Sequence, residues 1–209
     1  MIALDRARHP WRMETMLPRL KQARIVMAGI VAALWVIEGI DTLLRNALDS
    51  FGIVPRQLSG LSGIAVAPLL HAGFAHVAAN SIPLFALGSV VWTEGIKRWL
   101  TTIVTTWLSS GVFAWLIGPA QAVVIGASGV IFGLITYLIV RGFLSRSWIH
   151  LAIGLVVMFA YGYALLGIFP WAVGPHVAWQ GHLGGALGGV LAAWLLHRNS
   201  RKPRTRPII

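Results

Sequence analysis

The chain has 209 residues, of which 57% are hydrophobic and 11% charged. Soluble domains carry about 25% charged residues, so this composition excludes an ordinary soluble domain. The apolar residues fall into runs of about 20, which is long enough to cross a bilayer. Cysteine is absent, which removes disulfides, thiolate metal sites and a cysteine nucleophile. The composition therefore predicts an all-α polytopic membrane protein.

The N-terminal segment, residues 1–24, is basic and has no apolar stretch ending in a small-residue cleavage site, so we expect no removable signal peptide. One membrane domain over residues 25–197 and a basic tail at 198–209 are expected to follow. Within the domain we expect six spans, at residues 25–44, 77–91, 99–117, 128–144, 149–169 and 181–196. The long loop at 45–75 is too apolar for a solvated linker, and we expect it at the membrane interface or folded onto the bundle.

Lysine and arginine are distributed unevenly along this topology. With the N-terminus in the cytoplasm, all but two of the 17 Lys and Arg residues lie on the cytoplasmic side, Arg45 and Arg56 being the exceptions. Such a bias is typical of bacterial and other membrane proteins. The net charge of +11 is thus interpreted as a topology signal and a contact with anionic lipid, not as a nucleic-acid surface.

Polar residues in hydrocarbon are costly, so those within the spans are candidates for function. The segment HAGFAHVAAN opens the second span with His71, His76 and Asn80. His76 and Asn80 are four residues apart and share one helical face. The segment GASGVIFG opens the fourth span with Ser128, whose helix N-terminus favours a developing negative charge.

The last span opens with GHLGGALGG, which places His182 at the head of a glycine-rich face. Each of these clusters alone has an ordinary explanation, as a polar seam, a helix cap or a close helix contact. All three, however, fall near the outer ends of spans two, four and six. Glycines in the fourth and sixth spans predict close packing there, with Ser128 and His182 within hydrogen-bond reach.

This constellation suits acyl transfer by a serine–histidine dyad. His182 can take the proton of Ser128 and return it to a leaving amine. His76, the Asn80 amide and the Ser128 backbone N–H can supply an oxyanion hole. Phe132, one turn after Ser128, can stack on the imidazole of His182. A third triad member is not evident, and whether Glu38 or Asp41 assists His182 stays open.

The pattern HxxxxHxxxN, then GxSG, then GHxxG, together with GIVPRQLSGLSGI in the first loop, resembles the rhomboid proteases from about residue 51 to residue 197. The resemblance implies a six-helix rhomboid bundle in the bacterial inner membrane, both termini cytoplasmic and the active site opening to the extracytoplasmic side. It implies no cofactor, and substrates that are transmembrane segments of other membrane proteins. The implied roles are Ser128 as nucleophile, His182 as base, His76, Asn80 and Ser128 as oxyanion donors, and Gly126, Gly129, Phe132 and His71 in support.

The chain departs from the family at two places. Phe132 stands where many members have tyrosine, and the tryptophan–arginine pair often found in the first loop has no clear match. These departures concern loop structure and substrate choice.

Three alternatives remain. His71, His76 and His182 could bind a metal, although no HExxH motif accompanies them. A catalytically inactive rhomboid-like protein could bind transmembrane helices of client proteins. A transporter would need midplane charges or an inverted repeat. His150 and His176 are expected in loops and need no role, although His176, in the loop before the last span, could touch substrate. The oligomeric state is unknown.

Overall fold

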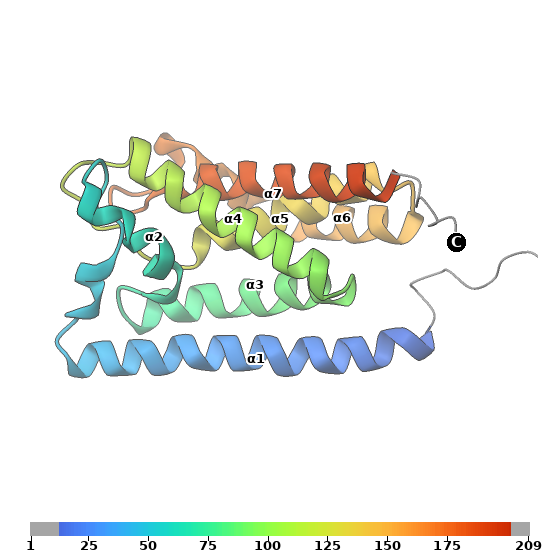
Figure 1. The fold of residues 1–209 in the computed structure, drawn as a ribbon, viewed down its shortest axis with the longest axis horizontal. Helices are drawn as coiled ribbons and strands as arrows, with labels where there is room; N and C mark the ends of the chain where they lie inside the picture. The colour runs from blue at the N-terminus through green and yellow to red at the C-terminus, as the bar shows by residue number, and fades with distance from the viewer. Residues whose placement is uncertain (1–12, 202–209) are drawn as a thin grey trace, which may run out of the picture.

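The structure is a computed structural model that describes residues 13–201, and Figure 1 shows it as a bundle of long helices. Residues 1–12 and 202–209 lie outside the described residues, and they include part of the basic N-terminal segment and most of the basic C-terminal tail. The long helices of the described part are α1 (Met13–Leu43), α3 (Phe74–Thr93), α4 (Ile96–Ile117), α5 (Ser128–Leu144), α6 (Trp148–Tyr161) and α7 (Trp179–Arg201). Successive long helices alternate in direction, so α3, α5 and α7 begin at the same end of the bundle.

The all-α membrane bundle is confirmed. Among the described residues, four helical segments are long and apolar enough to cross a membrane, Leu17–Leu43, Phe74–Thr93, Ile96–Ile117 and Trp148–Ile168. Helix α5 is apolar but only 17 residues long, and α7 carries glycines where apolar side chains would raise its hydropathy. Six spans therefore stay a prediction for the chain.

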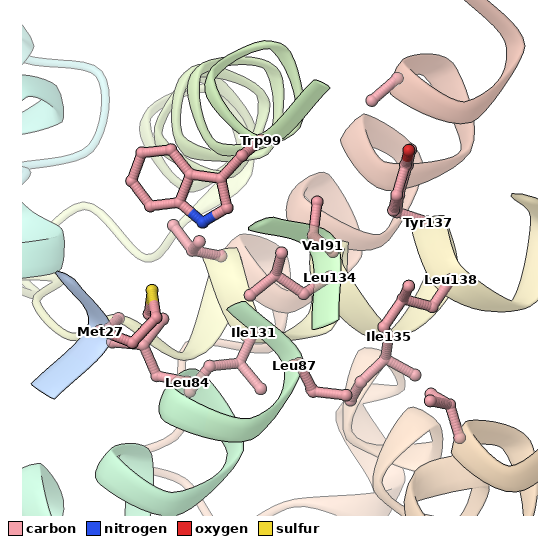
Figure 2. Packing of buried hydrophobic residues seen from close by; sticks show 14 of the residues in the cluster. Met27, Leu84, Leu87, Val91, Trp99, Ile131, Leu134, Ile135, Tyr137 and Leu138 are labelled. Carbon is pink, nitrogen blue, oxygen red and sulfur yellow. The ribbon is translucent and has the colours of Figure 1, made fainter. Parts of the chain in front are cut away.

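Helix α5 is the centre of the bundle. It packs against α7, α6, α4 and α3, whereas α1 packs mainly on α3. Most residues of α5 are buried by these neighbours, as expected for a mostly apolar helix in the core of a bundle. Figure 2 shows its side chains meeting those of the surrounding helices, and the labelled members of this core are Met27, Leu84, Leu87, Val91, Trp99, Ile131, Leu134, Ile135, Tyr137 and Leu138.

Glycines make the α5–α7 contact unusually close, as the sequence predicts. A Cβ placed on Gly185 would overlap the carbonyl of Gly129, and one on Gly189 would overlap the carbonyl of Gly133. Backbone thus packs directly on backbone at two successive turns, the arrangement that small residues allow between membrane helices. This contact brings the first turns of α5 and α7 together.

The fifth long segment differs from the single helix expected at 149–169. Helix α6 ends at Tyr161, and the chain continues as the 3-10 helices η4 (Gly162–Ile168) and η5 (Pro170–Ala172). Gly162 and Gly167 disfavour the α-helix in this stretch, and Pro170 lacks the N–H that a continuing helix needs. The outer part of this segment is therefore wound more tightly than an α-helix.

The loop expected at 45–75 folds onto the bundle. It forms short helical turns, η1 (Leu48–Phe51), η2 (Leu58–Leu61), α2 (Gly63–Val66) and η3 (Ala67–Leu69). Two tryptophans of α4 donate to its backbone, Trp107 Nε1 to the Ile64 carbonyl at 2.7 Å and Trp115 Nε1 to the Gln57 carbonyl at 2.8 Å. Two backbone carbonyls of the loop thereby have hydrogen-bond partners, which a position near the membrane requires.

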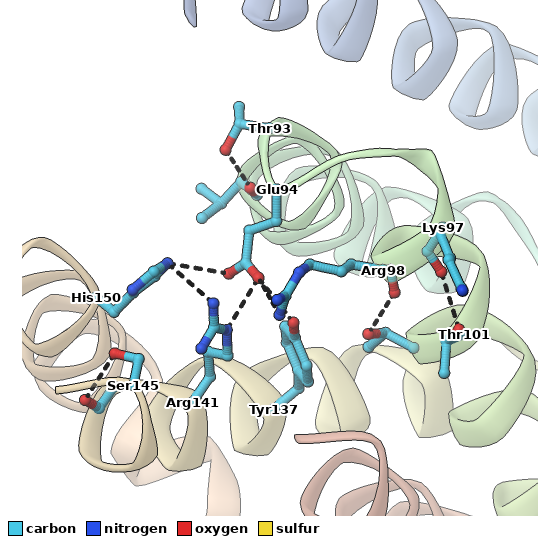
Figure 3. Close-up of polar contacts among 12 residues, drawn as sticks. Thr93, Glu94, Lys97, Arg98, Thr101, Tyr137, Arg141, Ser145 and His150 are labelled. Atoms are coloured by element: carbon cyan, nitrogen blue, oxygen red, sulfur yellow. Dashed lines mark hydrogen bonds and ion pairs between the residues drawn. The ribbon is translucent and has the colours of Figure 1, made fainter. Parts of the chain in front are cut away.

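A buried ionic network lies at the end of the bundle opposite to this loop, where α3 and α5 end (Figure 3). The side chain of Glu94, 4% exposed, accepts hydrogen bonds from Tyr137 Oη at 2.9 Å and from Arg141 Nε at 3.0 Å. Arg98 and His150 complete the network around the same carboxylate. The expectation that His150 lies in a loop without a role is wrong, because it sits buried in the first turn of α6 and joins that helix to α5.

Candidate active site

Ser128 is the first residue of α5, and the chain enters this helix through a constrained turn. Gly126 has φ of +116°, a conformation that favours glycine. A Cβ there would lie 2.7 Å from the His76 ring, so the position also has no space for a side chain. Because the first N–H groups of a helix have no partner within it, the amide of Ser128 is available to an anion.

His182 stands in the first turn of α7, and its ring is held at both nitrogens. Ser128 Oγ donates to Nε2 across 2.9 Å, and Nδ1 donates to the backbone carbonyl of Gly167 across 3.0 Å. The carbonyl of Gly167 can only accept, so Nδ1 carries the ring proton and Nε2 is the free base. The expected proximity of Ser128 and His182 is found, and the imidazole has the tautomer that a base requires.

The His182 ring is also fixed from its flat side. Phe132 stacks on it with ring centroids 4.1 Å apart and an interplanar angle of 7°. Gly167 closes the opposite edge of this pair, since a Cβ there would come within 2.9 Å of Phe132 Cζ and 3.5 Å of His182 Nδ1. The expected stacking is thus present, and a glycine in η4 makes room for it.

His76 and Asn80 lie on the inner face of α3 beside this pair. The N–H of Ala72 donates to His76 Nδ1 at 3.3 Å, which leaves the ring proton on Nε2, next to Gly126. Asn80 is 5% exposed, and its Nδ2 is buried without a hydrogen-bond partner among the described residues. The N–H groups of His76 and Asn80 thus line the same cavity as Ser128.

The remaining sequence candidates lie further out. His71 is buried, and its ring meets the His76 ring edge to face at 4.9 Å. Asp41 accepts a hydrogen bond from the Leu48 N–H at 2.7 Å, and the Glu38 carboxylate is buried without a partner in the described residues. Neither carboxylate holds His182, since the Gly167 carbonyl occupies that place. Gly129 supports the site only through the α5–α7 contact.

A cavity of about 550 Å³ opens over these groups. It is lined by Asp49, Ala72, His76, Asn80, Val123, Ile125, Ser128, His176, Val177, Ala178 and His182. Sequence reasoning missed Gly167, because a carbonyl acceptor has no side-chain signature. It also missed Asp49 as a lining residue, whereas His176 is placed by the sequence in the loop before the last span, within reach of substrate.

The geometry does not suit the three-histidine metal alternative. Both nitrogens of His182 are engaged, and no group of three His, Cys, Asp or Glu side chains in the described part of the chain converges at metal-binding distance. The arrangement instead combines a hydroxyl, an imidazole whose Nε2 is free to act as a base, and side-chain N–H groups around one cavity. That combination fits nucleophilic acyl transfer.

A family model for the rhomboid domain matches residues 58–199. This range contains every residue named for the candidate site except Glu38, Asp41, Leu48 and Asp49. The chain belongs to the rhomboid family. Its similar proteins include two that are described as uncharacterized, from Mycobacterium bovis and Mycobacterium tuberculosis, each 41% identical over 208 residues, 95% of this chain and 85% of the relative. Another from Mycobacterium leprae is 41% identical over 190 residues, 86% of this chain and 74% of the relative. This rhomboid is accordingly a multi-pass membrane protein.

Proposed function

We propose that this rhomboid is a serine endopeptidase that cleaves transmembrane segments of other membrane proteins within the bilayer. The observation that carries the proposal is the hydrogen bond of 2.9 Å from Ser128 Oγ to Nε2 of His182, whose Nδ1–H is held by the Gly167 carbonyl at 3.0 Å. A serine hydroxyl becomes a nucleophile when a positioned base accepts its proton.

The reaction follows from these contacts. Ser128 Oγ attacks the scissile carbonyl carbon while its proton passes to His182 Nε2, and the carbonyl oxygen becomes an oxyanion. The Ser128 amide, His76 Nε2–H and the Asn80 amide are the proposed donors to that oxyanion. The C–N bond then breaks, and His182 gives its proton to the departing amine. Water attacks the acyl-enzyme with His182 again as base, which releases the acid and restores Ser128.

A backbone carbonyl takes the orienting place that a carboxylate fills in a triad. Gly167 O fixes the tautomer of His182, and Phe132 fixes the plane of the ring. A neutral acceptor stabilises the imidazolium less than a carboxylate does, but it adds no further charge to a poorly solvated site. The economical mechanism is therefore a dyad.

The proposed setting is the bacterial inner membrane, with both termini in the cytoplasm and the cavity opening on the extracytoplasmic side. The positive-inside bias supports this orientation, since Arg45 and Arg56 flank the end of the bundle that carries the cavity. The basic residues Arg98 and Arg141 lie at the other end, in the Glu94 network. No cofactor is needed for the proposed chemistry.

The test uses the full chain in mild detergent with a fluorogenic substrate built on a transmembrane segment rich in small residues. Ser128→Ala and His182→Ala are each expected to lower turnover by at least about 10³-fold. Ser62→Ala is the matched control, because that exposed serine bonds only the Ser59 carbonyl in the first loop.

A serine-reactive fluorophosphonate in the same sample separates a wrong substrate from an inactive protein. Labelling of wild type and of Ser62→Ala, but not of Ser128→Ala, is the expected result. If folded wild type neither cleaves nor labels, the proposal fails and the inactive rhomboid-like alternative is favoured.

A further inference from the structure

Asp49 lines the same cavity as Ser128 and His182, and the proposed dyad chemistry does not use it. Among the described residues around this cavity it is the one carboxylate, and no lysine or arginine lines the wall. The other polar groups there are a hydroxyl, an amide and three imidazoles. A single acidic group in a substrate cavity imposes a charge preference on whatever enters.

The backbone around Asp49 holds it in this position. Asp49 lies in the 3-10 turn η1, whose first N–H, that of Leu48, donates to Asp41 Oδ1 at the end of α1. Just beyond the turn, Ile53 exchanges two backbone hydrogen bonds with Val124, at 3.0 and 2.9 Å. Val124 belongs to the segment that leads into Ser128. The backbone segment that carries Asp49 is thus tied to α1 on one side and to the Ser128 segment on the other.

The Asp49 carboxylate has no cationic partner among the described residues, and its hydrogen-bonding neighbour is another acid, Asp41. Its Oδ1 is buried without a hydrogen-bond partner, and the ion pairs found in the described part of the chain all use Glu94, at the opposite end of the bundle. Burial, followed by the charges of Asp41 and Glu38 and a hydrogen bond with the Asp41 side chain, raises the pKa of Asp49 to about 6. The negative charge is therefore destabilised by its neighbours, and a cation beside the unpartnered Oδ1 would stabilise it.

We propose that Asp49 is a specificity-determining residue that receives a lysine or arginine side chain of the substrate, next to the scissile bond on its extracytoplasmic flank. The inference rests on the proposed function, and it names a feature of the substrate. A side-chain cation fits better than a metal ion, because Asp49 does not converge with two further metal-ligating side chains in the described residues. Long basic side chains also reach polar groups while their stems stay in apolar surroundings.

The test measures binding without requiring cleavage. Labelled transmembrane peptides carry either lysine or glutamine at one extracytoplasmic flanking position at a time, and their affinity for Ser128→Ala protein is measured by fluorescence anisotropy. At one position lysine is expected to bind about tenfold more tightly than glutamine, the effect of one partly desolvated charge pair. In Ser128→Ala/Asp49→Asn this ratio is expected to fall to about one.

A charge reversal provides a result that misfolding cannot imitate. With Asp49→Lys in the same background, a glutamate peptide is expected to bind more tightly than the glutamine peptide at that position. Asp41→Asn is the matched control, because it removes a neighbouring charge yet keeps an oxygen for the Leu48 N–H. It is expected to preserve the lysine preference.

Equal binding of lysine and glutamine peptides at every position would overturn the inference. A preference that survives Asp49→Asn unchanged would do the same, since another group would then be its source. Fluorophosphonate labelling of wild-type Ser128 reports separately on the proposed protease function. A loss of labelling and a loss of charge preference are therefore distinguishable failures.

Discussion

Phe132 and His182 stack almost parallel, with an angle of 7° between rings whose centroids are 4.1 Å apart. Phe132 comes from α5 and His182 from α7, so the stack bridges the two helices that contribute the proposed dyad. The stack fixes the plane of the imidazole ring, and the hydrogen bond to the Gly167 carbonyl fixes the direction of Nδ1 within that plane. The base is therefore oriented without a carboxylate.

Replacing Phe132 tests this orientation. Phe132→Ala is expected to lower kcat by about tenfold, with little change in KM, because positioning of the base matters most in the transition state. Phe132→Tyr keeps the stack and should retain most of the activity. Steady-state kinetics on the fluorogenic substrate provide the measurement, and an unchanged kcat in Phe132→Ala would refute the role of the stack.

Gly167 offers a second, independent probe of the same ring. A methyl group at this position would come within 2.9 Å of Phe132 Cζ, so Gly167→Ala should displace the ring pair and lower kcat by about tenfold. Gly162→Ala is its matched control in the same 3-10 helix, because a methyl group there would find only Met158 Cγ at 3.8 Å. Equal turnover in the two variants would show that the Gly167 contact does not orient the base.

The α5–α7 contact predicts a large effect on stability from a single methyl group. Gly185→Ala would push its Cβ into the Gly129 carbonyl, and overpacking of this kind costs about 1–3 kcal/mol in the free energy of unfolding. Gly39→Ala on α1 is the control, because nothing lies within 4 Å of a Cβ there. Denaturation in mixed micelles should separate the two variants, and similar midpoints would contradict the close contact.

The Glu94 network predicts that loss of one charge is costly. Glu94→Gln leaves Arg141, 8% exposed, without its counter-ion, and removing one partner of a buried pair typically costs about 3–5 kcal/mol. Lys97→Gln removes an exposed charge three residues away and should change the free energy of unfolding by less than about 0.5 kcal/mol. The same denaturation assay measures both, and a Glu94→Gln variant as stable as Lys97→Gln would show that the network is not stabilising.

His71 predicts a pH dependence of stability. Burial, and to a lesser degree the neighbouring His76, lowers the pKa of His71 to about 4. The unfolded chain binds the proton near its ordinary value of about 6.5, so the folded state loses stability as the pH falls from about 6.5 toward 4.

The comparison with His71→Phe isolates this contribution. Phenylalanine keeps a ring against His76 but cannot titrate, so its apparent melting temperature should fall less between neutral pH and about pH 5. Asp49 has the opposite effect on stability, because its raised pKa means that the folded state binds the proton at a higher pH than the unfolded chain does. Since Asp49 is present in both proteins, its contribution cancels in the comparison. Parallel falls in the two proteins would contradict a neutral, buried His71.

Much of the site could be predicted because its chemistry resides in side chains with marked spacing. His76 and Asn80 share a face at a separation of four residues, and Ser128 and His182 each open a helix. The glycines that allow α5 and α7 to touch are visible as a repeat. His150 was misjudged because Glu94 is distant in the chain and Arg141, although near in sequence, lies on a different helix. The three residues meet only when the end of α3, α5 and α6 pack together.

By itself the sequence determined the membrane class, the apolar helices and the residues able to perform acyl transfer, because hydropathy and side-chain chemistry are local properties. Only the tertiary structure decided how the base is oriented, by the carbonyl of Gly167, and which carboxylate reaches the cavity, Asp49 instead of Glu38 or Asp41. The physical reason is that every residue has a backbone carbonyl, so the sequence does not single out that of Gly167. Glu38, Asp41 and Asp49 also lie close in sequence, so their order in the chain does not show which one reaches the cavity. Which of these groups faces Ser128 depends on how η1 and η4 fold against the ends of α1, α5 and α7.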